Sequence, residues 1–227
     1  MRKITQKLKR ALLIALAVAM IVPPVNGMAA TQKQKALNAY RKYLAQSQII
    51  LAGEKVRSSE TKFALAQINN DKDGIPELIV QKKLPGVNRG AFAVFTYSNG
   101  RIVRVMNGND YEGFLGYYSK TGVIRTRDYS PMGRNNSYKE YFSCLSGTKT
   151  ITKLRKEHSI NPRNDKPCYY YFAGRYDRTK TTNRDGMLTK TSRSKFAASL
   201  KSITRSKTVI KFKFYSNTSG NRSKYCK

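Results

Sequence analysis

The chain has 227 residues, with 44 Lys and Arg against 13 Asp and Glu, which gives a formal net charge of +31. Its three cysteines and one histidine form no CxxC or Cys/His metal spacing, and the chain contains no GxSxG, Walker-type or GxGxxG motif. The motif-defined zinc, serine-hydrolase and nucleotide-binding classes are therefore excluded, and the charge favours polyanions as partners.

Residues 1–30 have the order of a secretory signal peptide. A positive segment is followed by twelve uncharged, apolar residues from Ala11 to Val22, by Pro23-Pro24, and by small residues up to Ala29 and Ala30. Twelve helical residues cover about 18 Å, which is short of the ~30 Å hydrocarbon core of a membrane. We therefore expect a signal peptide cut after Ala29 or Ala30 rather than a transmembrane anchor. No cysteine lies nearby to carry a lipid.

Residues 31–227 are predicted to form a single exported domain that is soluble and has no transmembrane segment. Without the five cations of the signal segment, this part carries about +26. Such a charge favours wall polymers, anionic lipid headgroups, glycans or nucleic acid. The alternative is a solvated surface that only keeps the protein soluble.

The first predicted element of this domain is a helix over residues 31–51. Apolar residues recur at three- and four-residue steps, and Gly53 is placed to end the helix. The residues of this stripe are Leu37, Tyr40, Tyr43, Leu44 and Leu51.

Strands follow from Lys62 onward. The segments 62–68 and 77–82 flank an acidic loop, and Asn99-Gly100 joins two apolar, β-branched segments in the strongest local hairpin signal. The segments 96–103, 117–124 and 141–151 each place aromatic residues, a serine and a glycine before a β-branched stretch. We interpret them as successive hairpins of one antiparallel meander.

The C-terminal part is predicted from similar local signals. Residues 158–167 form turns, 168–174 an aromatic strand, and 175–186 a basic loop. Thr191 or Ser192 caps a helix whose apolar face carries Phe196, Leu200 and Ile203. A closing strand over 208–215 turns Ile210, Phe212 and Phe214 inward, and the tail from Asn217 is expected to fray. The fold class is thus α+β, an antiparallel β-meander with an N-terminal helix and a C-terminal helix plus closing strand.

Cys144, Cys168 and Cys226 allow one disulfide in an exported protein. Cys144 and Cys168 fall in predicted strands of one sheet, which favours their pairing and leaves Cys226 as the odd cysteine.

The acidic loop "NNDKDGIPE" concentrates carboxylates in a basic chain. Counted from Asn69, the loop has oxygen-bearing side chains at positions one, three, five and nine, a glycine at position six, and a main-chain carbonyl available at position seven. Calcium takes six to eight oxygen ligands at such spacings. The predicted metal ligands are Asn69, Asp71, Asp73, Ile75 (through its carbonyl) and Glu77. An EF-hand is excluded because Val80 stands at position twelve.

The nine-position loop resembles the calcium-binding hairpin loops of integrin-type FG-GAP repeats, which have the pattern DxDxDGxxD between two strands. The resemblance covers about 20 residues, with Asn69 and Glu77 in place of two aspartates. It implies structural Ca²⁺ that locks the hairpin. The alternative is a bare turn in which the same side chains cap their own main chain.

The whole chain also resembles a family of small exported proteins, often lipoproteins, of Gram-positive gut bacteria. The segments that carry this resemblance are "AYRKYL", "FALAQINNDKDGIPELIV", "VFTYSNGRIVRV", "YYSKTGVI" and "FKFYSNTSGNR". It implies an extracellular or cell-wall location and a single domain, without an activity.

The predicted function is that of an exported, non-catalytic basic protein that binds anionic polymers at the cell envelope. Tyrosines among lysines and arginines can stack on sugars or bases, or else fill the core. The main alternative is a wall or glycan hydrolase that uses Asp110, Glu112 and Asp128 as its acids. A third hypothesis, a basic toxin or nuclease, requires His158 in a cleft, whereas a lone histidine beside Glu157 is expected to be solvated.

Overall fold

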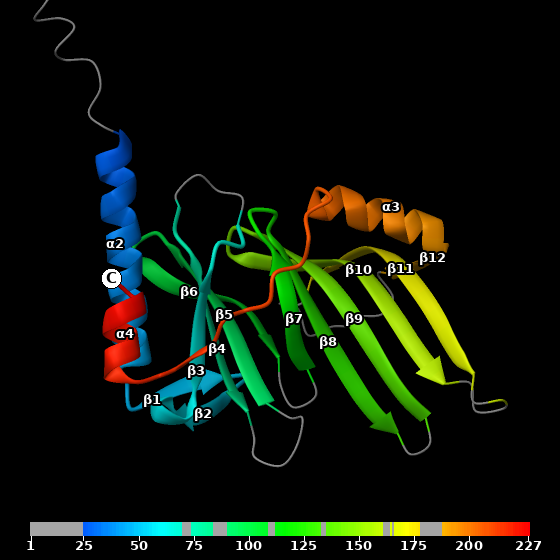
Figure 1. Ribbon diagram of the computed structural model, residues 1–227, viewed down its shortest axis with the longest axis horizontal. Coiled ribbons are helices and arrows are strands. Elements are labelled where there is room, and N and C mark those ends of the chain that lie inside the picture. The colour runs from blue at the N-terminus through cyan, green and yellow to red at the C-terminus, as the bar shows by residue number, and fades with distance from the viewer. Residues whose placement is uncertain are drawn as a thin grey trace, which may run out of the picture.

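The computed structural model describes residues 25–69, 74–83, 90–108, 112–132, 135–160, 164, 166–177 and 188–227. Figure 1 shows helices at both ends of this part of the chain and antiparallel strands between them, which confirms the predicted α+β class. The strands follow one another as in a meander, but they divide into two main sheets rather than one.

The first sheet has five strands in the order β13-β3-β4-β5-β6. Their bounds are β13 Tyr215–Ser216, β3 Lys62–Ala66, β4 Glu77–Lys83, β5 Gly90–Ser98 and β6 Arg101–Gly108. The hairpin predicted from Asn99-Gly100 is present, and both residues have positive φ angles, of 51° and 77°. That is the backbone conformation a tight two-residue turn requires.

The second sheet has six strands arranged in sequence order from β7 to β12. Their bounds are β7 Glu112–Tyr118, β8 Val123–Met132, β9 Asn135–Ser146, β10 Lys149–Ile160, β11 Pro167–Asp177 and β12 Leu188–Thr191. The hairpins expected over 117–124 and 141–151 join β7 to β8 and β9 to β10. His158 and Pro167, both expected in turns, lie instead within β10 and β11.

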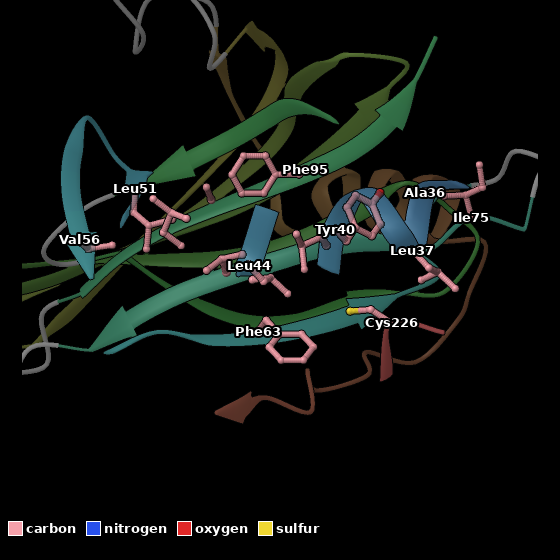
Figure 2. Packing of buried hydrophobic residues seen from close by; sticks show 14 residues of the cluster. Ala36, Leu37, Tyr40, Leu44, Leu51, Val56, Phe63, Ile75, Phe95 and Cys226 are labelled. Carbon is pink, nitrogen blue, oxygen red and sulfur yellow. The ribbon is translucent and has the colours of Figure 1, made fainter. Parts of the chain in front are cut away.

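Helices α2 (Val25–Leu44) and α4 (Ser219–Tyr225) cover one face of the five-stranded sheet. Tyr40, Leu44 and Phe63 are completely buried in this layer, and Figure 2 shows them packed with Leu37, Phe95 and Cys226. Full burial of one such side chain stabilises the fold by about 1.5–3 kcal/mol. The predicted helical stripe is therefore a core contact.

The other face of the five-stranded sheet packs against the six-stranded sheet. Ile79 and Val94 from the first sheet meet Ile124 and Leu145 from the second in one buried cluster. Residues 205–214 cross this junction on their way from α3 (Arg193–Thr204) to β13, as the orange-red segment in Figure 1 shows. The closing strand is much shorter than the predicted 208–215, because only Tyr215–Ser216 forms β13. Phe212 and Phe214 pack into the cluster as predicted, whereas Ile210 is exposed and pairs through its main chain with Tyr117.

Helix α3 lies over the outer face of the six-stranded sheet, beside β10 and β11 (Figure 1). Ser192 caps this helix by accepting a hydrogen bond from the Lys195 amide at 3.3 Å. Of the two residues predicted as the cap, Thr191 and Ser192, it is thus Ser192 that has this role. Phe196, Leu200 and Ile203 face the sheet, as expected. The helix covers only part of this outer face.

The predicted end of the first helix and the predicted fraying of the C-terminal tail are both wrong. The first helix ends at Leu44, and Leu51 belongs to a hairpin of β1 (Gln48–Leu51) and β2 (Glu54–Arg57), so that Gly53 occupies a hairpin turn instead of a helix cap. The tail does not fray: α4 packs on α2, and Asn217 and Cys226 are buried. Ile49 and Leu51 alternate with exposed neighbours, which is strand periodicity within a segment that also fits a helix.

The predicted cysteine pairing is also wrong, because all three thiols are free. Cys144 in β9 pairs with Ile151 at one end of β10, and Cys168 in β11 pairs with Ser159 at the other end. Burial raises the pKa of Cys226 to about 11, which keeps this thiol protonated.

None of the described helices is long and apolar enough to cross a membrane. Residues 1–24 lie outside the described part, and α2 begins at Val25, before the predicted cleavage site. The signal peptide remains a prediction.

Candidate functional site

The hairpin between β3 and β4 is closed by the carboxylate of Glu77. This side chain is only 1% exposed. One of its oxygens accepts hydrogen bonds from the main-chain N–H groups of Ile68, at 2.9 Å, and Asn69, at 3.2 Å, and the other accepts from Asn69 Nδ2 at 2.5 Å. A buried carboxylate needs such donors. Glu77 therefore fixes the start of the loop onto the start of β4.

The loop is held at two further points. Gln67 donates from its side chain to the carbonyl of Gly74 at 2.7 Å, which joins the two ends of the loop. The side chain of Ile75 is buried in the core beside Ala36 of α2 (Figure 2). Gly74 has a φ of +66°, a conformation that favours glycine and that supports the predicted chain reversal.

Three of the five predicted metal ligands thus lie in the described part of the chain, namely Asn69, Ile75 and Glu77, while Asp71 and Asp73 lie outside it. Asn69 and Glu77 are in direct contact. Their oxygen chemistry fits calcium, but both oxygens of Glu77 already accept N–H donors. A bidentate role for Glu77 would require those donors to move. Among the described residues no group of three or more His, Cys, Asp or Glu side chains gathers in one place, and Ca²⁺ at this loop remains a prediction.

The carboxylates proposed for hydrolysis are brought together only in part. Strand register pairs Glu112 of β7 with Asp128 of β8, while Asp110 lies outside the described residues. On its other side Asp128 is paired with Lys139 of β9. One cross-strand pair of acids by register, Glu112 and Asp128, therefore favours the hydrolase hypothesis, and a cation, Lys139, is the register partner of Asp128 on its other side.

A row of aromatic rings crosses the outer face of the six-stranded sheet, on the part that α3 leaves uncovered. We call Tyr138, His158 and Tyr169 the aromatic row; they come from β9, β10 and β11 and are direct register partners. The His158 ring lies 4.7 Å from that of Tyr138 and 4.9 Å from that of Tyr169. Tyr169 is 49% exposed, so the row opens to solvent at that end.

Cations flank the aromatic row. The guanidinium of Arg127 lies 4.6 Å from the centre of the Tyr138 ring, and the ammonium of Lys156 lies 5.7 Å from that of Tyr169. Cations over ring faces are attracted by the π-electrons, so the rings and the cations hold one another in place.

Next to the row, Glu140 joins two arginines. It accepts from Arg125 and Arg127, each with a shortest N–O distance of 2.6 Å, and it is only 2% exposed. Burial acts to raise the pKa of Glu140, but the hydrogen bonds and charges of Arg127 and Arg125 outweigh it and hold this pKa below its usual value. Of the described acids, the register places Glu140 beside the aromatic row and Asp177 at the far end of β11 on this face, against the cations Arg125, Arg127 and Lys156. The face therefore keeps a positive excess.

The polar groups of this row are suited to donating hydrogen bonds. Burial, followed by the nearby negative charge of Glu140, raises the pKa of Tyr138, so that its phenol stays protonated and is a donor at neutral pH. Arg127 Nε and His158 Nδ1 are buried atoms for which no hydrogen-bond partner is found among the described residues. Arginine, lysine and phenol donors in one row match the oxygens of an anion.

Sequence reasoning missed the position of His158 within the aromatic row. The segment after Leu154 has no apolar alternation, and the histidine was expected to be solvated before a turn. The available signal was the period of two in Leu154, Lys156 and His158 together with the tyrosine run 169–171. Only the pairing with β9 and β11 shows that these residues share one face.

Comparisons with family models, with curated proteins and with solved structures found no match for this chain.

Proposed function

We propose that the protein is an exported, non-catalytic basic protein that binds anionic polymers at the cell envelope through the aromatic row and its flanking cations. The single observation that carries this proposal is the row itself, in which Tyr138, His158 and Tyr169 stand in register, with Arg127 over the Tyr138 ring and Lys156 over the Tyr169 ring. The charge of about +26 on residues 31–227 supplies long-range attraction.

The arrangement of the rings determines which groups of the protein contact a bound polymer. Because His158 and Tyr169 are stacked on each other, with ring planes 30° apart, the row presents ring edges rather than open ring faces. The contact is therefore made by phenol hydroxyls and cationic donors with sulfate, phosphate or carboxylate oxygens. Stacking of sugar rings is secondary.

The proposal is tested by equilibrium titration of the protein with heparin at physiological salt, with uncharged dextran as the neutral control. The test variant is the double substitution Arg127→Gln and Lys156→Gln. The matched control is Arg193→Gln with Lys201→Gln, which removes the same charge from exposed positions of α3. Urea unfolding of both variants checks that the fold is retained.

We expect the test variant to bind heparin about tenfold more weakly, which corresponds to about 1.4 kcal/mol, and the control variant to change much less. A second variant, Tyr138→Phe with Tyr169→Phe, keeps rings and charge and removes two phenol donors, so it is also expected to bind more weakly. Equal weakening in the two charge variants would show that only net charge matters and would overturn the assignment of this site.

A further inference from the structure

A second polar site lies at the other end of the molecule, where the end of α2, the β1–β2 hairpin and the start of α4 meet (Figure 1). A shallow cavity of about 650 Å³, widely open to solvent, is found here. This volume is within the usual range of about 300–1,000 Å³ for small-molecule sites. The walls come from residues 44–48, 57–59, 217–219 and 222.

The cavity walls carry positive charge and many uncharged polar groups. Arg57 and Arg222 line it, and no acidic residue does. The exposed carboxylate of Glu60 acts on Arg57 electrostatically, but Lys82 is its hydrogen-bonded partner. The remaining walls are serine, threonine, glutamine and asparagine apart from Leu44 and Ala45, and no aromatic side chain lines the cavity.

The back of the cavity is rigidly built around Asn217. Its amide nitrogen donates to the carbonyls of Leu44, at 2.9 Å, and Ser58, at 3.0 Å, so it ties α2 and the segment after β2 to the C-terminal segment. Arg222 donates through Nη1 to both oxygens of Asn217, at 2.9 and 3.2 Å. One nitrogen of Arg222 is thus anchored, and the guanidinium is held in a fixed position before any ligand arrives.

One buried hydroxyl in the wall lacks a partner. Ser58 is 4% exposed, and no hydrogen-bond partner for its Oγ is found among the described residues. Both main-chain polar groups of Ser58 are hydrogen-bonded, because its N–H donates to the carbonyl of Ser47 and its carbonyl accepts from Thr61 and Asn217. Buried polar atoms are nearly always paired, so an unpaired hydroxyl in a polar cavity indicates a position where a bound group completes the hydrogen bonding.

From these features we propose that the cavity binds a single sugar unit that carries an oxyanion, either a phosphate ester or a carboxylate. A guanidinium matches the paired oxygens of both groups. The serine, threonine and glutamine side chains suit the hydroxyls of a sugar, and the lack of aromatic walls disfavours a nucleobase. The proposal is independent of polymer binding at the aromatic row, which lies on the other sheet.

The test is a titration of the full chain with glucose 6-phosphate, glucuronate, glucose and inorganic phosphate, at physiological salt. Binding is followed by main-chain amide chemical shifts. We expect glucose 6-phosphate or glucuronate to shift residues 44–48, 57–59 and 217–222, and to bind about tenfold more tightly than glucose or inorganic phosphate. The ratio between the two sugar acids identifies which oxyanion the cavity prefers.

Variants separate the cavity from general charge. Arg57→Gln is expected to weaken binding of the preferred sugar acid about tenfold, while Arg193→Gln, the same change on exposed α3, leaves it unaltered. Ser58→Ala is expected to weaken binding without lowering stability, because the hydroxyl has no partner in the free protein. Binding of inorganic phosphate as tight as that of the sugar acids, shifts spread over the whole surface, or equal effects of the two arginine variants would each overturn the proposal.

Discussion

Glu77 illustrates how a single buried carboxylate organises a loop. Its oxygens accept from Ile68 and Asn69, and its neighbour Ile75 anchors the far side of the loop in the core. These contacts hold the two ends of the hairpin loop together. Calcium would then act on the carboxylates of Asp71 and Asp73, and its effect is measurable as added stability.

The calcium prediction is tested by thermal unfolding with chelator and with millimolar Ca²⁺. At 100 times its Kd, a ligand of the folded state adds about 2.7 kcal/mol, so we expect the wild type to melt at a higher temperature in calcium. Asp71→Ala is expected to lose most of this gain. The control variant Glu54→Gln removes a carboxylate from an exposed position of β2. This variant should keep the calcium-dependent gain in melting temperature. Identical melting of the wild type with and without calcium would leave the hydrogen-bonded turn as the whole explanation.

Glu140 gives the protein a pH-dependent stability. Its pKa in the folded state is held below its usual value mainly through Arg127 and Arg125, against the opposing effect of burial. Its stabilisation is therefore complete above the pKa of the unfolded chain and is lost as the pH falls through the folded pKa.

The corresponding variant is Glu140→Gln, which removes the charge and keeps the shape. At pH 7 it is expected to lower the free energy of unfolding by about 1.5–3 kcal/mol, the range for hydrogen bonds to charged groups, with the lower part favoured because Arg127 is 41% exposed. As the pH falls below the pKa of an ordinary glutamate, about 4.3, we expect the difference from the wild type to shrink. Urea unfolding at several pH values measures it, and a difference that stays constant down to pH 3 would contradict this role.

At the scale of elements, residues 205–214 connect the two sheets through main-chain contacts with β7. Tyr117 and Ile210 exchange two hydrogen bonds, of 2.9 and 2.8 Å. This approach is possible because residue 116 is glycine: a Cβ there would lie 2.5 Å from the Ile210 carbonyl oxygen.

Gly116→Ala is therefore expected to lower the free energy of unfolding by about 1–3 kcal/mol, the usual cost of forcing extra atoms into a packed contact. Gly113→Ala is the matched control, because a Cβ at this position of the same strand has nothing within 4 Å. Urea unfolding of the two variants gives the comparison. Equal stabilities would mean that the crossing segment moves aside easily and does not hold the sheets together.

The elements that were predictable from sequence are those with a strong local signal. The hairpin at Asn99-Gly100 and the helix capped at Ser192 each carry their own turn or cap residue, and both are present. The α2–β1 boundary has no such stop signal, and the segment 44–51 satisfies helix and strand periodicity alike. The conformation of the main chain in this segment is determined by the pairing of β1 with β2.

The structure of the polar C-terminal segment was predicted wrongly for a different reason. Its sequence, "NTSGNRSKYC", has little apolar content, and short polar helices are marginal in isolation. Asn217 is fixed by acceptors at Leu44 and Ser58, far away along the chain, and Tyr225 stacks on Tyr215 with ring centres 3.7 Å apart. Contacts of this kind cannot be inferred from a local pattern. The cavity is formed by two of the regions whose structure was predicted wrongly, the segment after α2 and the C-terminal segment.

For the whole molecule, the proposed class of partner rests on composition, and the proposed binding surface rests on the fold. A net charge of +31 attracts any polyanion, and the outer face of the six-stranded sheet adds three aromatic rings in register, flanking cations and an acid, Glu140, that two arginines neutralise. The aromatic row and the cavity lie at opposite ends of the molecule (Figure 1). Polymer binding and sugar-acid binding can therefore be measured separately.

The most direct measurement is amide chemical-shift mapping of the protein with a short heparin oligosaccharide at physiological salt. If the aromatic row binds the polymer, the largest shifts fall on Arg127, Tyr138, Lys156, His158 and Tyr169, and they disappear with the double substitution Arg127→Gln and Lys156→Gln. Shifts of similar size at exposed cations over both sheets and α3 would contradict the account, because they would show attraction by net charge without a dedicated surface.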